Sequence, residues 1–318
     1  MSQLPIEILA ADIGGTNSRF GIFSFGKSDP IYQISLKTQD FSSFYELLVA
    51  FKKSQPSISF EQIKSAVFAV AGPIVDVNKI NPPNISWNIA LADVSGALGI
   101  ENASLINDFQ AQALAILSAE EKNKIEIFKG KSKDTHPRAV IGAGTGFGKS
   151  LLIRAESGKY QSIASEGGHN DFSATSDQEF AFRKFAMERR NLTQFTWDDV
   201  LSGRGLEILH EFISSEKLSA VEISSRYLGS ESKTLEMFSR FYARAARSFV
   251  LETMALGGLY IAGGVAAKNS LIVQSKFFKE SFFASIYKEI LQEVPVYLLT
   301  SEDSGLRGAA YEAFRLSS

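Results

Sequence analysis

One loop pattern occurs twice in this chain, and it constrains the possible fold more than any other feature. Residues 6–25 read IEILAADIGGTNSRFGIFSF, and residues 138–154 read RAVIGAGTGFGKSLLIR. In each, an apolar run, a turn of Gly and Thr, and a second apolar run predict a strand, a tight turn and a strand. Glycines let a backbone approach a ligand closely, and turn N–H groups that point one way form an anion site. Two such hairpins predict two halves that bind one polyphosphate.

Strand-like and helix-like segments alternate along the rest of the chain. Short apolar runs predict strands at residues 31–36, 65–70, 105–107, 259–262 and 294–300. Apolar spacing of three and four predicts helices at residues 44–52, 111–117, 177–190, 235–254 and 305–315. This alternation predicts the α/β class with partly parallel sheets. A length of 318 residues suits two domains, which we expect at residues 1–109 plus 305–318 and at residues 110–304.

The composition excludes several classes of protein. The net charge is −2, so no cationic excess points to nucleic acid or an anionic membrane. The absence of cysteine excludes disulfides, thiolate zinc sites and cysteine nucleophiles. The longest uncharged apolar stretch, residues 253–267, holds 15 residues and four glycines, whereas a membrane span needs about 20 apolar residues. The first residues lack the cationic segment of a signal peptide. We therefore expect a cytoplasmic soluble protein.

The first hairpin turn carries a carboxylate beside its glycines. Asp12 directly follows an apolar run and precedes Gly14, Gly15 and Thr16. The glycines and the hydroxyl would contact phosphate oxygens. Asp12 would face Mg²⁺ through water, because Mg²⁺ keeps most of its own waters. On these residues alone, a hairpin turn with an Asx cap explains the pattern equally well.

The second turn is similar to two helix-associated phosphate motifs but fits neither. A Walker A loop would need glycine at Ala143, and G-x-G-x-x-G would need glycine at Phe147 or Lys149. Both motifs also require a following helix, whereas residues 151–154 are typical of a strand. The alternating glycines from 142 to 148 are denser than a turn requires. We expect a phosphate-binding hairpin that does not need Lys149 as a phosphate ligand.

Three further segments offer backbone or polar groups at predicted strand ends and loops. Gly263-Gly264 fits either a plain turn or a close approach to adenine or ribose. Asp108 follows Asn107 where a strand gives way to a helix, and local structure alone favours Asp108 as the helix N-cap. Glu166 and His169 flank two glycines. A His–Glu pair also suits zinc, but no second His or Cys has ligand spacing.

Taken together, these motifs resemble the bacterial glucokinase family. The segments that carry the resemblance are ADIGGTNSRF, LINDFQAQALAI, GAGTGFG, EGGHNDF, LSGRGL and LYIAGGV, which occur in order along nearly the whole chain. Members of this family are sugar kinases of the actin-like, ribonuclease H-like ATPase fold. The resemblance implies two α/β domains around a central cleft, each with one phosphate hairpin, and it implies a homodimer.

The resemblance also implies a role for each matching residue in phosphoryl transfer from ATP to the 6-hydroxyl of glucose. Asp108 matches the general base. The implied sugar-binding residues are Asn84, Asn107, Asp108, Glu166, His169 and Asp198. The implied MgATP residues are Ala11, Asp12, Ile13, Gly14, Gly15, Thr16, Gly144, Thr145, Gly146, Gly263 and Gly264, with Asp12 facing Mg²⁺. Trp87, three residues after Asn84, fits the core better than the sugar pocket.

Two departures from the family pattern leave the substrate open. Asp198 stands where the family usually has Glu, and Arg204 stands where LSGPG has Pro. Two outcomes are open for the shorter Asp198. It reaches the sugar, through water, or it changes the sugar specificity of the enzyme toward fructose, mannose or N-acetylmannosamine. The phosphoryl donor, which is ATP, ADP or polyphosphate, also stays open. A cysteine-bound zinc, as in related kinases of the repressor-and-sugar-kinase superfamily, is not expected in a chain without cysteine.

Two other classes of function fit the sequence less well. A sugar-sensing regulator would carry a DNA-binding helix-turn-helix arm, whereas this chain starts at its first strand with a net charge of −2. A structural ATPase of the actin type would have no use for the Asn107–Asp108 and Glu166–His169 clusters. We therefore expect a glucokinase whose partners are ATP and a sugar, with no nucleic acid and no membrane.

Overall fold

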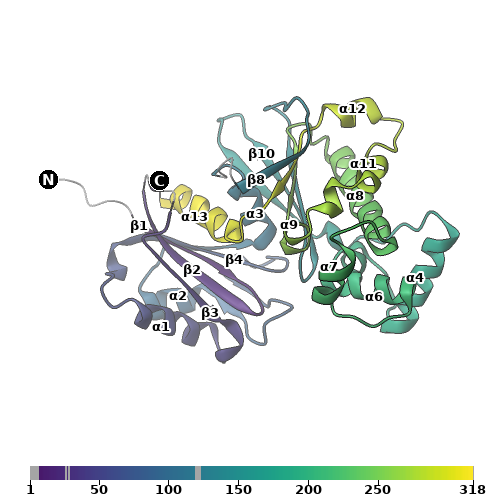
Figure 1. The fold of residues 1–318 in the computed structure, drawn as a ribbon. Helices are drawn as coiled ribbons and strands as arrows, with labels where there is room; N and C mark the ends of the chain where they lie inside the picture. The colour runs from purple at the N-terminus through teal and green to yellow at the C-terminus, as the bar shows by residue number, and fades with distance from the viewer. Residues whose placement is uncertain (1–6, 26, 28, 119–122, 318) are drawn as a thin grey trace. The chain divides into compact units, whose positions relative to one another are not determined.

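The chain forms two compact units in the computed structural model, which describes residues 7–25, 27, 29–118 and 123–317 (Figure 1). Unit 1 comprises residues 1–119 and 302–318, and unit 2 comprises residues 120–301. The sequence places the first boundary at residue 109, inside helix α3 (Asp108–Ala115). The structure keeps α3 in unit 1 because it packs against the last helix, α13 (Ser304–Ser317).

Unit 1 is built on a five-stranded sheet in which the first hairpin is confirmed. The strand order is β3-β2-β1-β4-β7. Strands β1 to β3 are antiparallel, whereas β4 and β7 run parallel to β1. The strands are β1 (Glu7–Ile13), β2 (Asn17–Ser24), β3 (Tyr32–Lys37), β4 (Ile63–Val70) and β7 (Ala103–Asn107).

Helices cover both faces of this sheet. Helices α1 (Phe44–Ser54) and α2 (Leu91–Leu98) pack on the face that carries Leu9, Ala11 and Ile13. Helices α13 and α3 lie on the opposite face (Figure 1). Alternate residues of β1 therefore point into two apolar layers, which explains its nearly continuous apolar sequence. The shorter elements are η1 (Thr38–Asp40), η2 (Phe60–Gln62), β5 (Lys79–Ile80) and β6 (Ile89–Ala90).

Unit 2 repeats the strand order and strand directions of unit 1. Its sheet has the order β11-β10-β9-β12-β13-β8, in which the first five strands correspond to β3-β2-β1-β4-β7 and β8 adds an antiparallel edge. The strands are β8 (Lys124–Phe128), β9 (Arg138–Ala143), β10 (Phe147–Arg154), β11 (Tyr160–Ser165), β12 (Leu259–Ala262) and β13 (Val296–Leu299). The duplication seen in the hairpins thus extends to whole sheets.

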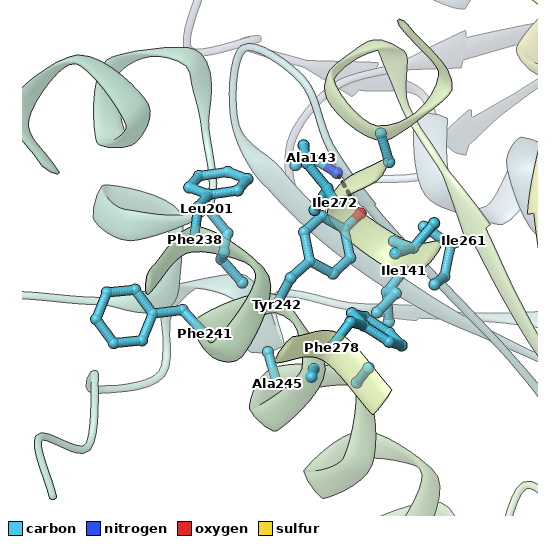
Figure 2. Packing of buried hydrophobic residues seen from close by; sticks show 14 of the residues in the cluster. Ile141, Ala143, Leu201, Phe238, Phe241, Tyr242, Ala245, Ile261, Ile272 and Phe278 are labelled. Carbon is cyan, nitrogen blue, oxygen red and sulfur yellow. Dashed lines mark hydrogen bonds between the residues drawn. The ribbon is translucent and has the colours of Figure 1, made fainter. Parts of the chain in front are cut away.

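The core of unit 2 is rich in aromatic side chains. Tyr242 of α8 (Lys233–Thr253) is buried among Phe238, Ile141 and Phe278 (Figure 2).

Within the described residues, no helix combines the length and apolar character needed to span a bilayer. The other helices are η4 (Gly167–His169), α4 (Asp177–Arg190), α5 (Trp197–Val200), α6 (Gly203–Ser214), α7 (Ala220–Tyr227), α9 (Gly264–Lys268), α10 (Leu271–Gln274), α11 (Lys276–Phe282) and α12 (Lys288–Glu293).

Candidate active site

The predicted nucleotide-binding residues and Asp108 lie at the carboxyl ends of parallel strands. In unit 1, Asp12 lies at the end of β1, and Asp108 directly follows β7. In unit 2, Gly144 follows β9 and Gly263 follows β12. The strands within each of these sets run parallel, so their carboxyl ends lie at one edge of their sheet. Ligands of open α/β sheets bind at this edge.

The first hairpin loop is fixed by a buried threonine that sequence reasoning missed. The hydroxyl of Thr38 donates to the carbonyl of Gly14 at 2.6 Å, and the backbone N–H of Thr38 donates to the carbonyl of Thr16 at 3.0 Å. Thr38 is buried, whereas Thr16 is exposed. The only sequence signal for this contact is the position of Thr38 just after the strand that pairs with β2.

Asn84 lies directly against the same loop. A Cβ added to Gly15 would lie 2.8 Å from the carbonyl oxygen of Asn84, so only glycine permits this approach. The structure thus brings the predicted sugar contact and the predicted phosphate loop together within unit 1. Trp87 instead stacks on Phe44 and donates its indole N–H to the carbonyl of Phe41 at 2.9 Å, which confirms its place against the core.

Asp12 is a partly buried carboxylate with one neighbouring cation. Its Oδ2 lies 3.6 Å from Nη1 of Arg19, the residue opposite on β2. A Cβ on Gly305 would lie 2.8 Å from the same oxygen, so the first turn of α13 packs directly against it. Burial raises the pKa of Asp12, and Arg19 opposes this shift. A desolvated carboxylate of this kind fits Mg²⁺, which proteins hold through one or two carboxylates together with substrate phosphates.

Asn107, and not Asp108, caps helix α3. The side-chain oxygen of Asn107 accepts the N–H of Phe109 at 2.9 Å, and its amide donates to the carbonyl of Gly72 at 3.1 Å. The purely local prediction that Asp108 is the N-cap is therefore wrong. Asp108 is the first residue of the helix, is partly exposed, and also accepts the N–H of Phe109 at 3.0 Å.

The second hairpin loop is anchored on both sides. Gly144 donates to the carbonyl of Gly146 at 2.8 Å, and Gly203 at the start of α6 donates to the carbonyl of Gly144 at 3.0 Å. The hydroxyl of Tyr242 accepts the N–H of Ala143 at 3.1 Å (Figure 2). Burial raises the pKa of Tyr242, so this hydroxyl stays neutral. The exposed Thr145 lies at the tip.

Glu166 and His169 are brought together at the two ends of η4. Nε2 of His169 lies 3.9 Å from Oε2 of Glu166, and both side chains are exposed. The glycines between them are dictated by packing on β10. A Cβ on Gly168 would lie 1.8 Å from the carbonyl oxygen of Phe147, and one on Gly167 would lie 3.2 Å from Cδ of Lys149. The predicted sugar loop therefore rests on the strand that leaves the second phosphate loop.

Lys149 lies beneath this loop and away from the hairpin tip. Its ammonium is 5.3 Å from the ring centroid of Phe249, and the side chain is buried. Burial lowers the pKa of Lys149, while Glu252 opposes this shift. Gly263 has a φ of +86°, and an added Cβ would lie 2.5 Å from the carbonyl oxygen of Ala143. The turn after β12 therefore requires glycine whether or not a nucleotide approaches it.

The carboxylate of Asp198 is already engaged within unit 2. Its Oδ1 accepts the N–H of Phe147 at 2.6 Å, and its Oδ2 lies 3.6 Å from Nη2 of Arg204. The neighbouring Asp199 has a different task. It accepts the hydroxyl of Thr196 at 2.9 Å as part of a capping box and pairs with Arg190 at 3.3 Å.

Comparison with known proteins assigns this fold and chain to a family. The family model described as Glucokinase matches residues 9–315. A glucokinase from Nostoc punctiforme is 30% identical, with 97% of this chain and 99% of that protein covered. A solved glucokinase from an Antarctic psychrotroph is 27% identical, with coverages of 97% and 99% and a TM-score of 0.82. A ROK family glucokinase from Streptomyces griseus, solved with glucose and AMPPNP, is 16% identical, with coverages of 97% and 99% and a TM-score of 0.62. The expected actin-like α/β fold is confirmed, and the chain belongs to the glucokinase family.

Proposed function

We propose that this protein transfers the γ-phosphoryl group of ATP to the 6-hydroxyl of glucose, with Asp108 as the general base. The observation that carries the proposal is the position of Asp108 at the carboxyl end of β7. Asp12 and the first phosphate loop lie at the same sheet edge of unit 1. Phosphoryl transfer needs in-line positioning, charge neutralisation and a carboxylate that accepts the hydroxyl proton. Unit 1 supplies candidates for each of these tasks.

The backbone of the two hairpins and of the β12 turn would bind the nucleotide. The proposed residues are Ala11 to Thr16, Gly144 to Gly146, and Gly263 and Gly264. Their support is the pair of anchored glycine loops, together with the glucose and AMPPNP bound in the Streptomyces griseus structure. Asp12 would hold Mg²⁺ through water. When bound, this ion would supply positive charge to the β- and γ-phosphate oxygens.

The sugar would be oriented by polar groups that the fold holds in place. These are Asn84, Asn107, Glu166, His169 and Asp198. Asn107 is pre-oriented because its amide is fixed by Phe109 and Gly72. Buried groups that require a hydroxyl partner discriminate strongly against analogues that lack it. A different hexose is the second candidate, because Asp198 is shorter than the Glu of the family pattern.

Family membership is the support for two further parts of the proposal, a homodimer and a cytoplasmic location.

The test is ATP turnover by the purified protein with Mg²⁺ and a panel of hexoses. We expect glucose to stimulate turnover and Asp108→Asn to lower kcat by about 10²- to 10⁴-fold, the usual contribution of a general base. Glucose affinity should change much less than kcat, because Asn keeps a polar contact with the 6-hydroxyl, and the thermal unfolding midpoint should stay near the wild-type value. Asp93→Asn is a matched control, because Asp93 is a partly buried carboxylate on α2 of the same unit.

Two results would contradict this proposal. Turnover that survives in Asp108→Asn would remove the general base. A wild-type protein that no hexose stimulates would remove the kinase activity itself. Stimulation by a different hexose alone would keep the mechanism and change the substrate.

A further inference from the structure

Asp198 is placed to control the shape of the second phosphate loop. Its side chain is only 14% exposed, and its Oδ1 accepts the N–H of Phe147, the first residue of β10, at 2.6 Å. A Cβ on Gly146 would lie 2.5 Å from this same oxygen. The loop backbone at Gly146 therefore packs directly against the carboxylate of Asp198.

A second contact ties the same loop to the same segment. The N–H of Gly203, five residues after Asp198, donates to the carbonyl of Gly144 at 3.0 Å. The loop from Gly144 to Gly146 is thus held at both ends by the stretch that runs from α5 into α6. Because a loop that is ordered before binding loses less entropy when a ligand arrives, these contacts favour binding by pre-organisation.

A carboxylate at this position also creates an electrostatic problem. An anion beside a loop that binds phosphate would repel it, unless its charge is compensated. Phe147 N–H offsets part of this charge, and Nη2 of Arg204 lies 3.6 Å from Oδ2. The Arg204 side chain is 59% exposed, so this ion pair contributes little to folding stability. The ion pair would instead reduce the negative electrostatic potential that Asp198 creates at the loop.

We propose that Asp198 is a positioning residue that holds the second hairpin loop in its phosphate-binding shape, with Arg204 compensating its charge. This inference rests on the proposed function only in that the loop binds ATP phosphates. It adds a role on the nucleotide side of the reaction to the proposed sugar contact of Asp198.

The test compares four variants by calorimetric binding of AMPPNP with Mg²⁺, glucose binding, and hydrogen exchange of peptides covering residues 144–148. Asp198→Ala should weaken AMPPNP binding about tenfold, the effect of one charge-assisted hydrogen bond, and speed exchange in the loop. Asp198→Asn keeps an acceptor oxygen for the N–H of Phe147, so its AMPPNP affinity and its loop exchange should stay near the wild-type values. Arg204→Gln should weaken AMPPNP binding by about threefold to tenfold, because it leaves the carboxylate uncompensated. The double variant Asp198→Asn/Arg204→Gln should recover this loss.

Asp199→Ala is the matched control. It removes the neighbouring carboxylate of α5 together with its ion pair to Arg190, but the hydrogen bonds of this carboxylate go to Thr196, the N-cap of α5, and not to Phe147. It should lower the thermal midpoint without changing AMPPNP affinity or loop exchange.

The outcomes separate this inference from the proposed function. Unchanged AMPPNP affinity with weakened glucose binding in Asp198→Ala would leave Asp198 with a sugar contact alone and overturn the inference. Equal effects of Asp198→Ala and Asp199→Ala would reduce Asp198 to a structural residue. If Asp198→Ala does not fold, the double variant replaces it in the test. When Asp198→Asn does not restore the AMPPNP affinity that Arg204→Gln loses, Asp198 is likewise only a structural residue. A wild-type protein that binds no AMPPNP would contradict the proposed function, and loop exchange would still report whether Asp198 holds the hairpin.

Discussion

At the scale of single residues, His210 shows how burial fixes a protonation state. Its ring is 1% exposed, Nδ1 lies 2.9 Å from the hydroxyl of Thr234, and the ring centroid is 4.4 Å from that of Tyr227. Burial lowers the pKa of His210, and Glu216, whose Oε2 is 3.8 Å from Nε2, opposes this shift. The folded protein therefore holds the neutral imidazole at neutral pH.

This state predicts a pH dependence of stability. Because the pKa is lower in the folded than in the unfolded chain, the unfolded chain binds the proton first as pH falls below about 6.5. The stabilisation is complete above that pH and is lost as pH falls toward the folded-state pKa. The thermal midpoint measured from pH 7.5 to 5.5 should fall more steeply for the wild type than for His210→Gln. Parallel slopes would contradict this assignment.

Single residues were predictable from the sequence where their surroundings are local. Asp12 and Asp108 follow apolar runs, so their positions at strand ends could be predicted. Thr38 and Tyr242 could not, because the backbone groups that they hold lie 24 and 99 residues away. The roles of the site residues remain predictions, since they depend on ligands that sequence patterns only imply.

At the scale of elements, two helical glycines differ in the space that surrounds them. Gly308 of α13 faces α3, where an added Cβ would lie 1.7 Å from the carbonyl oxygen of Ala111. Gly96 of α2 is exposed, and its added Cβ would meet only the ring of Tyr45 at an ordinary 3.5 Å. Helix propensity favours alanine at both positions, so packing alone decides the difference.

The same substitution should therefore change stability in opposite directions. Gly96→Ala should stabilise the protein by about 0.5–1 kcal/mol, the difference in helix propensity. Gly308→Ala should destabilise it by about 1–3 kcal/mol, as overpacking does, because two backbones must separate. Urea denaturation of the two variants measures both values. A stabilised Gly308→Ala would mean that α13 and α3 are less tightly packed than described.

Elements were predictable to the extent that their signals are periodic. The predicted helix at residues 177–190 has the bounds of α4, because Ser176 and Asn191 end it with local caps. Helix α3 was predicted three residues late, since its capping box uses Asn107 and Gln110, whose role no apolar period reveals. The first boundary between the units, which the sequence places at residue 109, lies ten residues later in the structure, because α3 packs against α13.

At the scale of the whole molecule, unit 1 is closed by the end of the chain. Helix α13 packs on β1 and β4. The hydroxyl of Ser65 on β4 donates to the carbonyl of Ala313 at 2.7 Å, and Asn102 reaches the carbonyl of Leu316 at 3.3 Å. Leu306 and Ala309 are fully buried. One face of the unit 1 sheet therefore depends on residues from the end of the sequence.

Removal of residues 304–318 should affect the two units unequally. We expect hydrogen exchange to lose its protection in β1 and β4, because the sheet face under α13 becomes exposed to water. Protection in β9 and β12 should persist, since unit 2 is built from residues 120–301 alone. Uniform loss of protection would show that the two units unfold together.

This arrangement sets an order of events during synthesis on the ribosome. Domains commonly fold in the order in which they emerge, beginning with the N-terminal one. Here the sheet of unit 1 is covered on one face only after α13 has been synthesised. Residues 120–301 already hold every strand of the unit 2 sheet. A nascent chain can therefore finish its second half first. A message truncated just before α13 would yield a protein in which unit 2 is complete and one face of the unit 1 sheet is uncovered.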